Sequence, residues 1–243
     1  MQTTLCLDFG NTRLKYAVFT GSAFSVAGVI ENDDTETIEK LLEECKPSKS
    51  ILSSVINHNA VAEELLAAKT KFHKLGTGSK LPFTTPVNKP ETIGADRLAL
   101  VAAAVNLHPA MHSLVIGLGS CITYNFINKF HQFLGGGISP GLEMRLRAMH
   151  EFTAKLPLIK PDSNIPLVGY DTRTNILSGV ILGISREMDG IIGEYELKYS
   201  NFNVLLTGGD MAFFAPHLKK KIFADPYLIY KGLYAISETN NVP

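Results

Sequence analysis

The sequence has almost no net charge, few cysteines and no apolar run long enough to span a membrane. Its 23 basic and 23 acidic residues cancel, so no overall field favours nucleic acid or an anionic membrane surface. No hydrophobic stretch approaches the roughly 20 residues that cross a bilayer. The first expected strand begins at residue 3, which leaves no room for a signal peptide. We therefore expect a cytoplasmic protein.

The three cysteines, Cys6, Cys45 and Cys121, are an odd number and lack the spacing of a metal site. Cys6 and Cys121 fall in expected strands, where a small buried thiol packs as an apolar group. We expect them to be reduced, in a reducing compartment. The seven histidines include no pair with metal-ligand spacing on a helix face, so we assign them to surface or core positions.

The length and composition fit a globular protein with a substantial core. Hydrophobic residues make up 45% of the 243 residues and charged residues 19%, which excludes a disordered chain. This length suits one large domain or two of roughly 100 to 130 residues.

The first half of the chain predicts three antiparallel strands followed by alternating helices and strands. Apolar residues at helical spacing predict a further helix from Ile93 to about Leu107. Between these parts, residues 76–92 are rich in proline, glycine and threonine without a period, which is typical of a loop near a site or a subunit contact. The strands expected in this half are 3–9, 15–20, 22–30, 49–55 and 72–75.

The second half repeats this arrangement, which indicates a diverged internal duplication. We therefore predict an α/β protein of two similar lobes, residues 1–110 and 111–243, each a mixed sheet with covering helices, and a nucleotide in the cleft. Pro140 suits the first turn of a helix over 140–156. The other elements expected here are strands at 112–117, 121–128, 131–135, 204–206 and 223–230, and helices at 172–198 and 232–238.

The turn after the first strand has the chemistry of a phosphate site. Gly10 lets an anion approach the backbone N–H groups, and Asn11 and Thr12 add short polar side chains. The carboxylate of Asp8 at the strand end suits Mg²⁺, which takes few protein oxygens beside the phosphates of a nucleotide. The alternative is an ordinary hairpin turn.

Further glycine turns follow strands at 117–120 and 207–210. Such turns on two similar lobes resemble the way in which the actin, hexokinase and Hsp70 superfamily binds ATP. Another motif, Gly94-Ala95-Asp96-Arg97, opens an apolar helix. We interpret Asp96 as a general base for an alcohol that attacks phosphorus, and Arg97 as a partner for an anionic group. The alternative makes Asp96 a favourable acid in the first helical turn and Arg97 a surface residue.

Taken together, these motifs resemble the type III pantothenate kinase family nearly end to end. The resemblance rests on the segments 8–12, 94–97, 135–141, 178–179 and 206–210, and the run Gly-Gly-Ile-Ser-Pro-Gly before the helix with Leu146-Arg147-Ala148-Met149-His150 is especially specific.

The resemblance implies roles for individual residues. Asp96 would accept the proton of pantothenate, Asp8 would hold Mg²⁺, and a monovalent cation, K⁺ or NH₄⁺, would sit beside the phosphates. Family members are homodimers, and the glycine run at 135 and the helix from Thr172 are plausible contact elements. The residues implied in binding ATP are Asp8, Phe9, Gly10, Asn11, Thr12, Arg13, Leu14, Lys15 and Ser120, and those implied in binding pantothenate are Gly94, Ala95, Asp96, Arg97 and Thr172.

Two positions depart from the family pattern. Gly117 stands where the family has an aspartate that binds the monovalent cation, and Val87 stands where it has a substrate-contacting tyrosine. These changes put catalytic efficiency in question and leave the fold expectation unchanged. The alternatives are a catalytically weak nucleotide-binding regulator and a kinase or phosphatase acting on a sugar or polyphosphate, against which the 94–97 motif argues.

Overall fold

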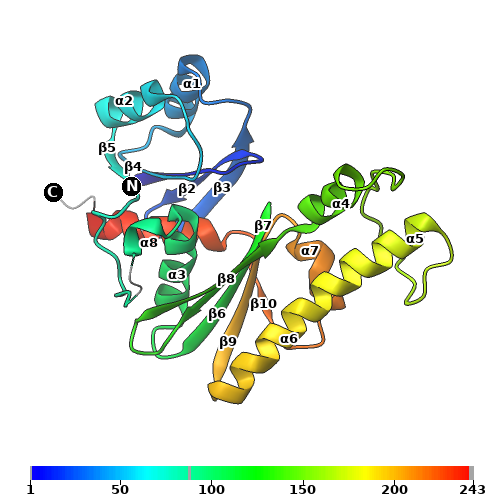
Figure 1. The fold of residues 1–243 in the computed structure, drawn as a ribbon. Helices are drawn as coiled ribbons and strands as arrows, with labels where there is room; N and C mark the ends of the chain where they lie inside the picture. The colour runs from blue at the N-terminus through cyan, green and yellow to red at the C-terminus, as the bar shows by residue number, and fades with distance from the viewer. Residues whose placement is uncertain (1, 87–88, 241–243) are drawn as a thin grey trace. The chain divides into compact units, whose positions relative to one another are not determined.

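The structure is a computed structural model that describes residues 2–86 and 89–240; Val87 lies outside the described residues. Contacts divide the chain into two compact units. The first unit comprises the residues up to 110 with 130–134 and those from 227 onward, and the second comprises 111–129 and 135–226. Each unit contains one five-stranded sheet (Figure 1).

The first sheet combines an antiparallel meander with two parallel strands. Its order is β3-β2-β1-β4-β5. Strand β1 pairs antiparallel with β2 and parallel with β4, as the alternation of the first half predicts. The strands are β1 (Thr3–Phe9), β2 (Leu14–Thr20), β3 (Ala23–Ile30), β4 (Lys49–Ser54) and β5 (Lys71–Lys74).

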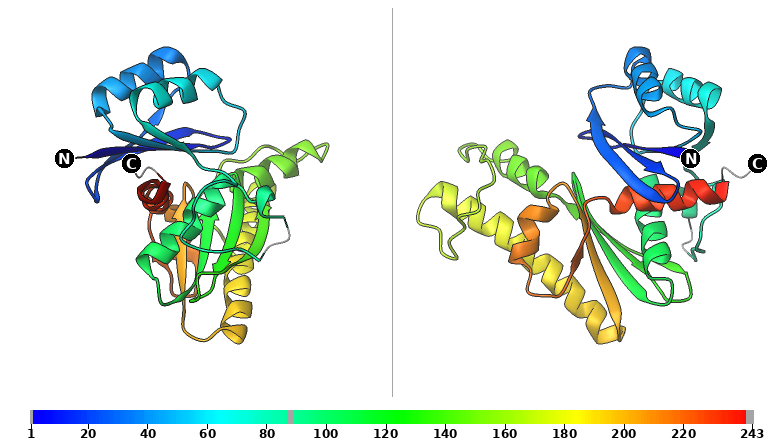
Figure 2. Two further views of the ribbon diagram at one scale, coloured as in Figure 1. Left: turned by 90° about the vertical axis from the view of Figure 1, so that its left-hand side faces the viewer. Right: turned by 180° about the vertical axis from the view of Figure 1, so that it is seen from behind.

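Helices cover both faces of this sheet (Figures 1 and 2). Leu5, Leu7 and Phe9 of β1 pack into one cluster with residues of α1 (Thr35–Cys45) and α2 (Ala60–Lys69). Alternate side chains of a strand point to opposite faces, so Cys6 and Asp8 lie on the other face. That face is covered by α8 (Leu228–Asn240), which packs on β1, β4 and α3 (Ala95–Leu107).

Helices α3 and α8 meet backbone to backbone. A Cβ added at Gly232 would lie 1.8 Å from the carbonyl oxygen of Ala99, so only glycine permits this approach. The ring of Tyr234 on the same helix stacks on Phe19 with centroids 4.6 Å apart. These contacts place residues 227–240 in the first unit. The predicted division at residue 110 assigned them to the second lobe.

The second sheet repeats the topology of the first. Its order is β10-β9-β6-β7-β8, with β6 antiparallel to β7 and parallel to β9. The correspondence of β6 to β1, β7 to β2 and β9 to β4 confirms two similar lobes. The strands are β6 (His112–Leu118), β7 (Cys121–Ile127), β8 (Phe133–Pro140), β9 (Phe202–Gly208) and β10 (Phe223–Ala224).

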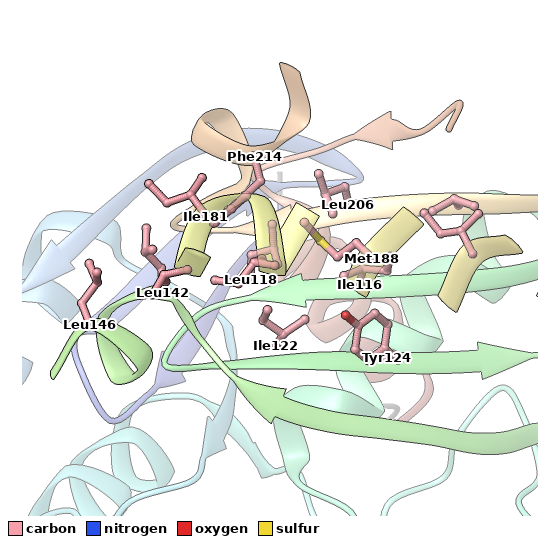
Figure 3. Packing of buried hydrophobic residues seen from close by; sticks show 14 of the residues in the cluster. Ile116, Leu118, Ile122, Tyr124, Leu142, Leu146, Ile181, Met188, Leu206 and Phe214 are labelled. Carbon is pink, nitrogen blue, oxygen red and sulfur yellow. The ribbon is translucent and has the colours of Figure 1, made fainter. Parts of the chain in front are cut away.

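The core of the second unit lies between this sheet and a long helical segment. Figure 3 shows Ile116, Tyr124 and Leu206 from the strands packed with Ile181 and Met188 from the helices. The segment expected as one helix from 172 to 198 contains a π-helical turn, which is frequent at functional sites. Its parts are α5 (Thr172–Leu177), the π-helical turn Ser178–Leu182 and α6 (Gly183–Lys198).

Pro140 does not begin a helix: it ends β8, and α4 (Leu142–Glu151) begins after the N-cap Gly141. Strand β8 lies at the edge of its sheet, where proline's missing N–H costs no ladder bond. The glycine run forms part of β8. A Cβ at Gly136 would lie 1.9 Å from the oxygen of Tyr124, so glycine at this position permits β8 to approach β7 closely.

The strand expected over 223–230 is also wrong beyond Ala224, because the residues from Leu228 form α8. Buried Leu228, Leu233 and Ile236 face the first unit's core, a tertiary contact that local propensity does not reveal.

Short helices complete the fold at Pro90–Thr92, α7 (Met211–Phe214) and Ala215–His217. Within 2–86 and 89–240, no helix is both long and apolar enough to cross a membrane.

Candidate functional site

The phosphate turn is a tight hairpin connection between β1 and β2. The N–H of Gly10 donates to the carbonyl of Arg13 at 3.2 Å. The side chains of Asn11, Thr12 and Arg13 are exposed at its tip. Leu14 then begins β2. The turn therefore presents polar groups to solvent at the carboxyl end of β1, a position open to a ligand.

Asp8 is a buried carboxylate beside this turn. Its side chain is 9% exposed, and in the sheet it stands opposite Lys15 on β2 and Ser53 on β4. Burial raises the pKa of Asp8 to about 6, the charge of Lys15 lowers it, and the nearby carboxylate of Asp96 raises it again. The structure therefore brings together two of the acids that the motifs predict.

Asp96 lies in the first turn of α3. Its carboxylate accepts a hydrogen bond from the backbone N–H of Arg97, as a helix-terminal acid does. Burial nevertheless raises its pKa, as expected for a reactive carboxylate. A Cβ at Gly94 would lie 2.5 Å from the Asp96 Oδ1 atom, so glycine leaves room for this acid.

The Asp8 site fits a divalent cation. Two carboxylates repel each other across it, and the only charge that lowers the Asp8 pKa is Lys15. The hydroxyl of Ser53 is fully buried beside Asp8, and its hydrogen bond to that carboxylate lowers the Asp8 pKa. No cluster of three or more metal-binding side chains occurs in the described ranges. The Asp8 carboxylate is the kind of ligand that suits Mg²⁺, which binds through one or two carboxylates, water and phosphate.

Arg97 is held beside the other residues of its motif. Burial lowers the pKa of its guanidinium, which lies 5.6 Å from the ring centroid of Phe133. The segment around Phe133 pairs with the proline-rich loop, since Thr84 donates to His131 at 2.9 Å and accepts from Phe133 at 2.8 Å. The loop is thereby fixed next to the motif.

A cavity of about 210 Å³ adjoins the 94–97 motif in the first unit. Ile93 and Leu98, which flank the motif, form part of its wall. The other lining residues are Gly76, Thr77, Leu81, Thr85, Pro90 and Glu91.

Gly117 in the second unit occupies the place that Asp8 has in the first. Each is the residue before last in its central strand. Where Asp8 stands opposite Lys15 and Ser53, Gly117 stands opposite Thr123 on β7 and Thr207 on β9. The second phosphate turn therefore has hydroxyl groups in register and no carboxylate at this position.

Ser120, in the second phosphate turn, rests on the corner between β8 and α4. Its carbonyl accepts from the N–H of Gly141 at 3.1 Å, and a Cβ at Gly141 would lie 2.3 Å from the oxygen of Gly119. Arg145 braces the corner by donating to the carbonyl of Pro140 at 2.9 Å and by pairing with Glu187. The helical spacing of this region does not reveal that ion pair.

Other predicted site residues also lie in the second unit. Thr172 is exposed in the first turn of α5, after the N-cap Asp171. The turn at 207–210 packs on the end of β6, since the N–H of Asp210 donates to Leu118 at 3.3 Å. Gly208 has a φ of +105°, and a Cβ there would lie 2.2 Å from the Leu118 oxygen, so glycine is required.

Sequence reasoning missed two residues near Asp8. Ser53 follows a plain strand pattern, and only the pairing of β1 with β4 places it beside the acid. Tyr230, 222 residues further along the chain, is buried on α8, where burial and then the charge of Asp8 raise its pKa. No local signal marks either residue, because both reach the site through tertiary structure.

Comparisons with known proteins agree with these motifs. The sequence profile of the family "Type III pantothenate kinase" matches residues 4–194. Proteins described as type III pantothenate kinase are 40% identical in Christiangramia forsetii and 39% identical in Bacteroides fragilis. The first match covers 97% of this chain and 98% of the relative, and the second covers 98% of both.

Solved structures share the fold. A Campylobacter jejuni protein described as a conserved putative Baf family transcriptional activator is 23% identical with a TM-score of 0.61, over 97% of this chain and 98% of that one. A glucokinase from an Antarctic psychrotroph is 10% identical with a TM-score of 0.54, over 99% of this chain and 100% of that one. At these identities the likeness concerns the fold alone.

Asp8→Asn should stabilise the metal-free protein at neutral pH. The pKa of Asp8 rises from 3.8 to about 6 on folding, so the folded state holds this proton more tightly than the unfolded state. The contribution of Asp8 to stability is therefore fully present below pH 4 and is lost, by about 3 kcal/mol, as the pH rises through 6. Denaturant unfolding with a chelator should show a gain in the variant above pH 6 that disappears near pH 4. An equal gain at every pH would contradict this assignment.

Proposed function

Because this chain belongs to the type III pantothenate kinase family, we propose how its own residues carry out that family's reaction. The protein is an ATP-dependent kinase that phosphorylates pantothenate to 4'-phosphopantothenate, the first step of coenzyme A biosynthesis. The observation that carries the mechanism is the pair formed by the buried Asp8 and the partly buried Asp96.

The turn after β1 binds the phosphates of ATP. Its backbone N–H groups and the exposed side chains of Asn11 and Thr12 offer hydrogen-bond donors. Lys15, in register with Asp8, adds positive charge. Asp8 would hold Mg²⁺, which would neutralise charge on the triphosphate. The residues of the first unit proposed for this role are Asp8, Phe9, Gly10, Asn11, Thr12, Arg13, Leu14 and Lys15.

Asp96 accepts the proton of the pantothenate hydroxyl as that oxygen attacks the γ-phosphorus. A carboxylate with a raised pKa is a better base than a solvated one, because its pKa is nearer to the working pH. Arg97 binds the carboxylate of the substrate. The cavity beside the motif takes the rest of the molecule. Gly94 and Ala95 complete the part of the pantothenate site that the first unit supplies.

Asp96→Asn should lower kcat by about 10² to 10⁴ while ATP still binds, since the amide cannot accept the proton. A coupled assay with pantothenate and ATP measures turnover, and fluorescent nucleotide titration measures binding. Glu39→Gln, which changes an exposed acid on α1, is the control and should keep both. Near-normal turnover in Asp96→Asn would reject the assignment of the base.

Gly117 makes this kinase weakly dependent on a monovalent cation. A carboxylate here would face the hydroxyl-bearing residues Thr123 and Thr207 and supply a charged ligand for K⁺ or NH₄⁺. Its absence is also the feature that favours the second candidate, a catalytically weak family member that binds nucleotide as an accessory regulator. Turnover of the unmodified protein in the coupled assay separates the two.

Gly117→Asp should raise activity or introduce a dependence on K⁺, because the variant restores the missing carboxylate. Initial rates measured in KCl against a tetramethylammonium salt at equal ionic strength test this. If neither the substitution nor the cation changes the rate, another residue has taken over the role.

The chain acts as a homodimer through an apolar surface of the second unit. Phe152 at the end of α4 is 86% exposed, and Leu167 and Val168 in the following loop are 83% and 79% exposed. Large exposed apolar side chains gathered on one segment are typical of a subunit contact. The segment from α4 to α5 is therefore assigned to the interface. A cytoplasmic location stays a prediction.

Phe152→Asp combined with Val168→Asp should convert the dimer to a monomer, because both charges would be buried in the contact. Light scattering coupled to size exclusion measures the mass. Leu197→Asp is the matched control, since Leu197 is 84% exposed at the end of α6 and outside this segment. A dimer that survives the double substitution, or an unmodified protein that is monomeric, would contradict the assignment.

A further inference from the structure

We infer that His58 is a positioning residue for Asp96, because it fixes the bend at residues 55–59 and this bend supports the start of α3. The bend connects β4 to α2. No motif of the sequence includes His58, and it acts on the base only through the backbone that it holds. The inference rests on the proposed role of Asp96 as the base.

His58 is buried, and both of its ring nitrogens are hydrogen-bonded. Its side chain is 6% exposed. Nε2 lies 2.7 Å from the Glu63 carboxylate in the first turn of α2, and Nδ1 lies 2.8 Å from the Ser54 hydroxyl at the end of β4. A carboxylate only accepts, so Nε2–H donates to Glu63. His58 therefore ties the end of the strand to the start of the next helix.

Contacts from two further strands hold this link in place. The Nζ atom of Lys74 on β5 pairs with the same oxygen of Glu63 at 2.6 Å. The His58 ring packs edge-on against the ring of Phe9 on β1, with centroids 5.6 Å apart. The N–H of Val55 donates to the carbonyl of Phe9 at 3.1 Å. The bend is thus anchored to β1 and, through Glu63, to α2 and β5.

The bend supports the helix that carries the base. Helix α3 packs on β4, and a Cβ added at Gly94 would lie 3.9 Å from the Cγ1 atom of Val55. Gly94 is the N-cap of α3 and offers no side-chain hydrogen bond, so packing rather than a capping side chain fixes the start of this helix. Asp96 follows two residues later. A shift of Val55 would therefore displace the carboxylate.

The phosphate turn has supports of its own. It is closed by the hydrogen bond between Gly10 and Arg13, and β1 is paired with a strand on each side. Loss of His58 should therefore move Asp96 while the turn stays in place. Such a change lowers the rate of transfer more than it weakens binding, because it alters the alignment of the reacting groups.

The chain offers a matched control at the other end of the same strand. The hydroxyls of Ser50 on β4 and Thr70 at the end of α2 are hydrogen-bonded to each other, so they also tie the strand to the helix. Ser50 stands opposite Leu5 on β1, whereas Ser54 stands opposite Phe9 beside the phosphate turn. Thr70→Val therefore removes a link between the same two elements at a distance from the motifs.

The test measures kcat and the KM values for ATP and pantothenate in the coupled assay, together with the free energy of unfolding. His58→Leu keeps an apolar side chain against Phe9. It should lower kcat about tenfold and change each KM less than about twofold, since a misplacement of about 1 Å can cost a hundredfold in rate. His58→Asn should recover part of kcat, because its amide can still bond to Ser54. Thr70→Val should keep kcat, even if its stability falls as far as that of His58→Leu.

Normal kcat in His58→Leu would overturn the inference. A rise of KM at unchanged kcat would do the same, because it assigns His58 to binding, and so would an equal fall of kcat in Thr70→Val, because it reduces the effect to stability. If His58→Leu does not fold, Ser54→Ala cuts the same link at a half-buried side chain and is judged by the same criteria.

Asp96→Asn distinguishes this failure from failure of the proposed function. If Asp96→Asn loses turnover and His58→Leu retains it, only the role of His58 is wrong. If both variants retain turnover, the assignment of Asp96 as the base is wrong as well.

Discussion

The burial of the Asp8 carboxylate under α8 and α3 is the constraint on which the rest of the site depends. A carboxylate on this face of the sheet is separated from water and lies near a second acid, so its charged form is disfavoured. A fold that keeps such a group loses stability in the absence of a counter-charge. In the proposed mechanism a cation held by Asp8 would supply that counter-charge, so the group that costs stability is also the group assigned to binding.

The duplicated sheet explains why candidate site residues lie at the end of the central strand in each unit. In both units the central strand ends in a glycine turn and has a parallel neighbour whose residues stand in register with its last positions. The two copies have diverged at one position, where one carries Asp8 and the other Gly117. The same backbone thus supplies a carboxylate in one unit and only hydroxyl-bearing neighbours in the other.

Much of the fold followed from local patterns. Strand β1 begins and ends where its apolar residues predict. The duplication was indicated by two copies of the same order, which is a strand, a glycine turn and two further strands. The errors arose where tertiary structure overrides local signals. Pro140 suits a helix start by itself but ends an edge strand, and residues 228–230 are helical because they face α3.

The candidate site was predicted in part. Motifs identified Asp8 and Asp96, and the structure brings these two together. The roles of Ser120 and Thr172 in the second unit stay predictions. Ser53 and Tyr230 had no signal, because sheet register and the packing of a distant helix place them.

The contact between Gly232 and Ala99 has a consequence for how the protein is made. The surface that covers Asp8 is supplied by α8, 220 or more residues downstream of the strand that carries this acid. During translation the first sheet therefore emerges from the ribosome with one face bare, and residues 111–226 are synthesised before its cover exists. The face of β1 that carries Cys6 and Asp8 is therefore completed only after α8 has been synthesised, and Asp8 becomes fully buried late in folding.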